Sequence, residues 1–140
     1  MSLSIRNQLP GTVTEVTQGE AMAAVKVRLT GGQDLTAAIT VEAVEDLGLT
    51  TGSAVRALVK STEISLATGL VGGLSIRNQL PGKVTDVITG TAMATVKIAV
   101  DGTSELTAAI TKDAATDLGL ASGTPVVALI KSTEVSLATA

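Results

Sequence analysis

The sequence contains no cysteine, no histidine and no aromatic residue. The absence of cysteine excludes disulfides, thiolate metal sites and cysteine nucleophiles. Without histidine the chain lacks the usual general base and the usual zinc ligand, so we expect a protein that is not an enzyme and that holds no metal cation. Without Phe, Tyr or Trp no base can stack on an aromatic ring, which argues against a binder of single-stranded nucleic acid.

The chain also lacks the charge and the apolar runs that direct proteins to nucleic acid or to membranes. Its formal net charge is −3, so no overall field attracts an anionic polymer or surface. It has no apolar run of the roughly 18 residues that a membrane helix needs. The opening segment MSLSIRNQ has no apolar core of a secretory signal. We therefore expect a cytoplasmic protein with no nucleic-acid and no membrane partner.

The sequence does contain a tandem repeat of one unit. The stretch LSIRNQLPG occurs at residues 3–11 and, letter for letter, at residues 74–82. The same offset continues without a gap as far as Thr139. We therefore expect two tandem domains joined by a short linker, with the bounds 1–68, 69–73 and 74–140.

Comparison of the two copies separates positions that drifted from positions that did not. TQGEAM in the first copy faces ITGTAM in the second, and VEAVE faces KDAAT. The blocks kept in both copies are few, and they are LSIRNQLPG, LTAAIT, DLGL and KSTE. We therefore expect the residues that both copies require, for a binding site or for the fold, to lie in these blocks.

Each copy predicts five strands and one short helix. Residues 21–29 alternate apolar and polar side chains, which is typical of a strand with one buried face. Residues 40–48 predict a short helix, because Thr40 suits the N-cap and Gly48 suits the position after the last turn. The order is β-β-β-α-β-β. We therefore expect an all-β fold with one short helix per unit, in the form of tandem OB-like five-stranded barrels.

Each unit is small for a domain whose core has only aliphatic side chains. A chain of about 60 residues buries only about 60% of its unfolded surface and is marginally stable alone. No disulfide can compensate here, and the composition is 45% hydrophobic. We therefore expect a closed homo-oligomer.

Three cations are kept at equivalent positions, as the pairs Arg6/Arg77, Lys26/Lys97 and Lys60/Lys131. In an extended strand Ser4 and Arg6 point to the same face, and Lys60 is followed by Ser61. A guanidinium, an ammonium and hydroxyls are what a small oxyanion needs. The alternative is a set of solvated charges, with Glu63 and Glu134 as ion-pair partners. For Lys26 and Lys97, which lie in the middle of an alternating strand, a solvated face is the favoured interpretation.

Two further kept features leave alternatives open. Thr40 and Thr111 cap the predicted helices, and a helix N-terminus also attracts an anion. The pairs Asn7-Gln8 and Asn78-Gln79 could join an anion site or form hydrogen bonds across a subunit interface. The chain has no Walker, GxGxxG or GxSxG motif.

The kept blocks resemble the Mop (molbindin) family of molybdate-binding domains. The matching residues are S-I-R-N-Q-L-P-G, then A-A-I-T before D-L-G-L, and K-S-T-E-V at the end of the unit. The resemblance covers both copies and implies an OB-like (Mop/TOBE-like) fold. It also implies a homotrimer of tandem chains, with molybdate or tungstate bound between units for intracellular storage. The alternative is an interaction module whose polar blocks only specify subunit interfaces.

The resemblance also implies the residues of the site by position. One unit gives a serine, an arginine and a Lys-Ser pair, and the helix-capping threonine with nearby backbone N–H groups comes from another unit. The predicted molybdate-binding residues are Ser4, Arg6, Asn7, Thr40, Lys60, Ser61, Ser75, Arg77, Asn78, Thr111, Lys131 and Ser132. Some relatives carry a serine three residues after the threonine, where this chain has Ala43 and Ala114.

Overall fold

The computed structural model describes residues 2–100 and 104–140. The first half contains β1 (Asn7–Gln18), β2 (Met22–Leu29), β3 (Asp34–Thr40), α1 (Val41–Leu47), β4 (Ala54–Val59), the 3₁₀ turn η1 (Ser61–Glu63) and β5 (Ile64–Ala67). The second half contains β6 (Asn78–Thr89), β7 (Met93–Val100), β8 (Ser104–Thr111), α2 (Lys112–Asp117), β9 (Pro125–Ile130), the 3₁₀ turn η2 (Ser132–Glu134) and β10 (Ser136–Thr139). Each half therefore has the predicted order of elements, with a 3₁₀ turn added between its last two strands.

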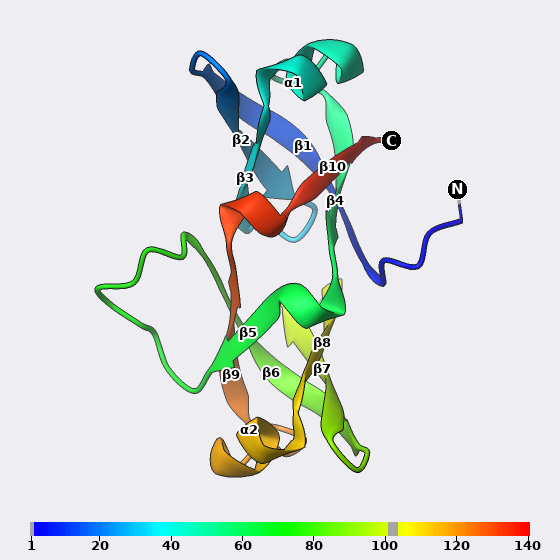
Figure 1. The fold of residues 1–140 in the computed structure, drawn as a ribbon, viewed down its shortest axis with the longest axis vertical. Coiled ribbons are helices and arrows are strands. Elements are labelled where there is room, and N and C mark those ends of the chain that lie inside the picture. The colour runs from blue at the N-terminus through cyan, green and yellow to red at the C-terminus, as the bar shows by residue number, and fades with distance from the viewer. Residues whose placement is uncertain (1, 101–103) are drawn as a thin grey trace.

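The two halves exchange their last strands. One antiparallel sheet has the order β10-β4-β1-β2-β3, and the other has the order β5-β9-β6-β7-β8. Leu137 of β10 lies opposite Ala57, and Leu66 of β5 lies opposite Ala128. In Figure 1 the red end of the chain runs along β4 in the upper body, and green β5 runs along β9 in the lower body. The five-stranded sheets are confirmed, but the fifth strand of each comes from the other half. The sequence repeats and the folded sheets therefore do not coincide.

The core is aliphatic and continuous between the halves. In β2 every second residue is buried, in the pattern that its alternating sequence predicts. The buried residues Val59 and Ile64 lie on either side of η1, and Ile130 and Val135 lie on either side of η2. All four belong to one cluster that contains residues of both sheets. The exchange therefore carries the core across the boundary between the repeats.

Both helices begin and end as the sequence predicts. The Thr40 side chain accepts a hydrogen bond of 3.1 Å from the Ala43 N–H, and the Thr111 side chain accepts one of 3.1 Å from the Ala114 N–H. Gly48 has a φ of 62°, in the left-handed region that favours glycine after a helix. Within 2–100 and 104–140, no helix has the length and apolarity that crossing a membrane requires.

Gly11 of the kept Pro-Gly pair sits where β1 crosses closely over β2. A Cβ atom at Gly11 would lie 2.7 Å from the Arg28 carbonyl oxygen and 2.7 Å from Val27 Cγ1. Gly11→Ala is therefore expected to lower the free energy of unfolding by about 1–3 kcal/mol, because the neighbouring backbone must move. Urea or thermal unfolding measures this change. Gly69→Ala is the matched control, because nothing lies within 4 Å of a Cβ there, and equal stability of the two variants would contradict the crowding.

Candidate functional site

A surface cavity in the second half collects four of the predicted site residues. Its volume is about 330 Å³, and its lining includes Ser75, Arg77, Lys131 and Ser132. The sheet register explains this proximity, because Asn78 of β6 lies opposite Ile130 of β9. The residues just before β6 and just after β9 therefore extend past the last strand pair side by side. We call these four residues the second cation group.

The first half repeats this strand register. Asn7 of β1 lies opposite Val59 of β4, so Arg6 and Lys60 extend past the last strand pair in the same way. The first cation group comprises Ser4, Arg6, Lys60 and Ser61. In the described part of the chain no carboxylate forms an ion pair with either of its cations. The group is therefore not explained as a set of internal ion pairs.

Ser61 of this group has an unusual side chain. Its Oγ atom is buried and has no hydrogen-bond partner within the described residues. A buried polar atom without a partner costs about 1–3 kcal/mol, so such atoms are rare in folded proteins. This hydroxyl follows Lys60 in the chain and has a hydrogen bond left to offer an anion.

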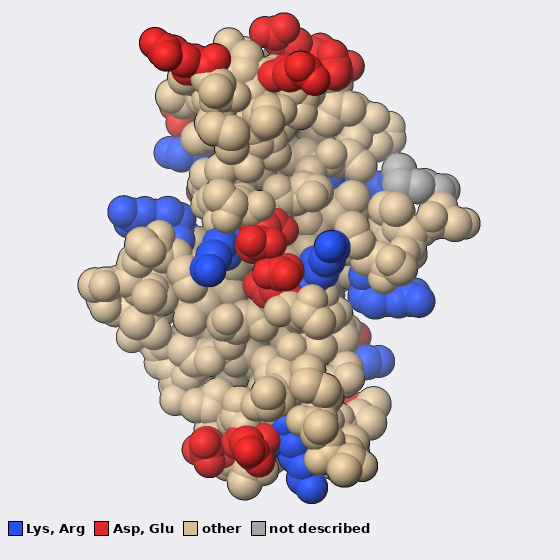
Figure 2. Space-filling view, viewed as in Figure 1, with Lys and Arg blue, Asp and Glu red and all other residues tan. Residues whose placement is uncertain are grey.

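Acidic residues lie close to the cations at the middle of the molecule. Lys60 lines a cavity of about 130 Å³ together with Glu63 and Glu134. Figure 2 shows acidic side chains at the waist of this face, with a basic side chain on either side of them. The carboxylates predicted as alternative partners are therefore near Lys60, although they form no ion pair with it in the described structure.

The helix-capping threonines lie elsewhere. Thr40 and Thr111 are both exposed. Thr40 lines a cavity of about 440 Å³ whose other lining residues include Glu20, Glu42 and Glu45. This cavity contains none of the cations of the first cation group. The prediction that the threonine joins the site from another unit therefore needs a second unit to bring it there.

The side chains of Asn7 and Asn78 are occupied within the chain. Both residues are buried, with 2% and 3% of their surfaces exposed. Asn7 forms hydrogen bonds to the backbone of Thr107, and Asn78 forms hydrogen bonds to the backbone of Thr36. These hydrogen bonds lie within one chain, between its two halves, so they are neither contacts with an anion nor the predicted bonds across a subunit interface. With their amides bonded to backbone atoms, Asn7 and Asn78 do not belong to the two cation groups.

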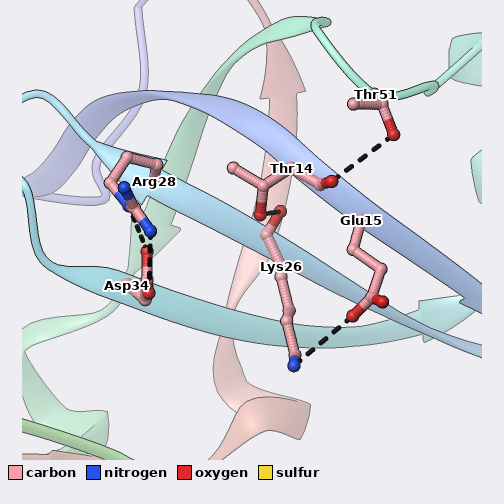
Figure 3. A network of polar contacts seen from close by, with 6 residues as sticks. All are labelled: Thr14, Glu15, Lys26, Arg28, Asp34 and Thr51. Carbon is pink, nitrogen blue, oxygen red and sulfur yellow. Dashed lines mark hydrogen bonds and ion pairs between the residues drawn. The ribbon is translucent and has the colours of Figure 1, made fainter.

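Two other cations of the first half pair with nearby carboxylates, as Figure 3 shows. Lys26 Nζ lies 3.4 Å from Glu15 Oε2, and both side chains are more than half exposed. Arg28 binds both carboxylate oxygens of Asp34. These hydrogen bonds lower the pKa of Asp34 from its ordinary value of 3.8. The prediction of a solvated face for Lys26 is confirmed.

Comparison with known proteins places this chain in a family. The model of the TOBE domain matches residues 3–66 and 74–137. The chain therefore belongs to the TOBE-domain family and contains the domain twice. The resemblance to the Mop domains is confirmed by the relatives described next.

The molybdenum-pterin-binding proteins MopB and MopA of Rhodobacter capsulatus are each 40% identical to this chain, over 96% and 99% of its length. The chain spans about half the length of these relatives, 50% and 52%. Molybdenum-pterin-binding protein 3 of Clostridium pasteurianum is 39% identical over 66 residues, which are 97% of that protein. A solved structure described as the cytoplasmic molybdate-binding protein ModG, with molybdate bound, superposes with a TM-score of 0.97 at 38% identity and full coverage of both chains.

Proposed function

We propose that this protein binds molybdate at its two cation groups. The observation that carries the proposal is the cavity that brings Ser75, Arg77, Lys131 and Ser132 together at the ends of two neighbouring strands. An arginine fork, a lysine ammonium and serine hydroxyls suit a tetrahedral dianion, because each donates to an oxygen and two of them carry positive charge. The unpartnered Ser61 hydroxyl supports the same role for the first cation group.

The comparisons support the ligand and the compartment. ModG, whose whole length this chain matches, is described as cytoplasmic and was solved with molybdate bound. Molybdate, or the similar tungstate, needs no catalytic group in order to be held. We therefore propose a cytoplasmic binding protein that stores the oxyanion and catalyses no reaction. The net charge of −3 and the lack of aromatic residues support a small anion, rather than nucleic acid, as the ligand.

We also propose that the sites are completed by assembly. The cations of both groups are exposed in the single chain, so a neighbouring copy has room to cover them. Apolar side chains are exposed as well, with Met22 and Met93 each 47% exposed and Ile88 57% exposed. A homotrimer of the repeat units 1–68 and 74–140, joined by 69–73, accounts for both features. In it, Thr40 and Thr111 approach the cation groups of other units.

Titration with molybdate, tungstate and sulfate tests the function. Molybdate at a hundredfold excess over its Kd is expected to raise the thermal midpoint by roughly 5–10 °C, because binding then adds about 2.7 kcal/mol to the stability. Sulfate is smaller and is expected to give a much smaller shift at equal concentration. Elemental analysis of the purified protein gives a second measurement. An assembled particle whose midpoint no oxyanion shifts would contradict the proposal and support the interaction module.

A further inference from the structure

Asn7 uses its whole side-chain amide to form hydrogen bonds to backbone atoms. Its Nδ2 atom donates to the Val59 carbonyl at 3.0 Å and to the Thr107 carbonyl at 2.9 Å. Its Oδ1 atom accepts from the Thr107 N–H at 2.7 Å. The amide thus pairs with both polar groups of Thr107, as a neighbouring strand would.

The backbone atoms that Asn7 contacts adjoin the first cation group. Asn7 directly follows Arg6, and Val59 directly precedes Lys60. The bond from Asn7 to Val59 therefore joins the two segments that carry the cations. The bonds to Thr107 attach both segments to β8, which is the outer strand of the opposite sheet.

The second half contains the same pair of bonds to the opposite sheet, in reverse. The Asn78 Oδ1 atom accepts from the Thr36 N–H at 2.8 Å, and its Nδ2 atom donates to the Thr36 carbonyl at 2.8 Å. Asn78 directly follows Arg77 and lies opposite Ile130, which precedes Lys131. Thr36 belongs to β3, the outer strand of the first sheet. Each asparagine therefore attaches one cation group to the sheet of the other half.

We propose that Asn7 and Asn78 are positioning residues of the oxyanion sites, an inference that rests on the proposed function. Neither side chain touches the anion. Each braces its own cation group against the outer strand of the opposite sheet, and Asn7 also joins the segment of Arg6 to the segment of Lys60.

The need for such a brace follows from where the cations lie. Arg6 precedes the first residue of β1, and Lys60 follows the last residue of β4, so neither has the support of a strand ladder on both sides. Terminal positions of this kind fray, and a long cationic side chain on a loose backbone binds weakly because ordering it costs entropy. The buried amide fixes the backbone on the adjacent residues and leaves the cations free to bind.

The test measures, in the full-length chain, how each asparagine substitution changes the Kd for molybdate of each cation group. Arg77→Ala with Lys131→Ala leaves the first cation group as the reporter, and Arg6→Ala with Lys60→Ala leaves the second. Asn7→Ala or Asn78→Ala is then added to each background, and the Kd for molybdate and the thermal midpoint are measured. Each asparagine is the matched control for the other, because both are buried and both are bonded to a threonine backbone.

Asn7→Ala is expected to raise the Kd of the first group by about tenfold or more and that of the second by less than about threefold. Asn78→Ala is expected to show the opposite pattern. If both variants weaken both groups in proportion to their lowered midpoints, the asparagines are merely structural and the inference is wrong. An unchanged Kd in both also overturns it.

If the alanine variants do not fold, Asn7→Ser and Asn78→Ser replace them, because a serine keeps a polar side chain at the buried position and adds no charge beside the anion. The same pattern is expected. If the reporter backgrounds bind molybdate but show no such pattern, the inference alone fails. If the parent chain itself binds no molybdate, the proposed function fails and the inference fails with it.

Discussion

Replacing Arg6 and Arg77 together by alanine is expected to weaken molybdate binding by about a hundredfold. Each arginine offers a dianion two charge-assisted hydrogen bonds, which together contribute about 3 kcal/mol or more, and 1.4 kcal/mol corresponds to tenfold in Kd. Both side chains are exposed at strand ends, so their removal leaves the core intact. Isothermal titration with molybdate measures the effect, and the unfolding midpoint without molybdate checks that the fold is kept.

The matched control removes two other cations that are also kept in both copies. Lys26→Ala with Lys97→Ala deletes the same formal charge as the arginine double variant. Lys26 lies in an exposed pair with Glu15, so the control is expected to change the Kd by less than about threefold. If the control weakens binding more than the arginine variant does, the site has been assigned to the wrong cations. Equal losses in both would indicate that only the overall charge matters.

Cutting the chain between the repeats is expected to leave the protein in one piece. Leu70 is 79% exposed, so a protease site inserted at residues 69–72 is accessible. After cleavage β5 still belongs to the sheet of the second half, and β10 still belongs to the sheet of the first. The two fragments are therefore expected to migrate together in size exclusion and native mass spectrometry. They separate only when denaturant unfolds the shared core.

The isolated fragment 1–68 provides the control for this experiment. Its sheet lacks β10, which leaves the edge of β4 unpaired, and β5 has no β9 on which to pair. We expect this fragment to be unfolded as a monomer or to pair with a second copy of itself. A folded monomeric fragment, or cleaved halves that separate in native buffer, would show that the strands are not exchanged in solution.

Local features were predictable because they depend on neighbouring residues. Alternation in residues 21–29 predicts β2, and the Thr40 cap and Gly48 predict both ends of α1. Arg6 and Lys60 are far apart in the sequence, and the family resemblance was needed to assign them to one site. The structure gives the physical reason for their proximity, which is the register of β1 on β4.

The strand exchange and the role of the asparagines were not predictable from local patterns. A strand such as β5 presents the same alternating side chains whether it pairs with its own half or with the other. Which sheet the strand joins depends on the path of the chain at Ser61–Glu63. The sequence STE is the same in both copies, so it does not indicate this path. The sequence could show that Asn7 was kept, but not that Thr107 lies beside it, a residue of the other half.

The exchange of the last strands also bears on how the two copies can evolve. Residues 61–68 read STEISLAT and residues 132–139 read STEVSLAT, so they differ at one position, Ile64 against Val135. Each of these segments must fit a sheet that the other copy supplies. A mutation in β5 therefore changes the packing of the second sheet, and a mutation in β10 changes the packing of the first sheet. The sequence of each half is therefore constrained by the other half. One copy cannot easily acquire a new function, because its last strand must still complete the sheet of the other copy.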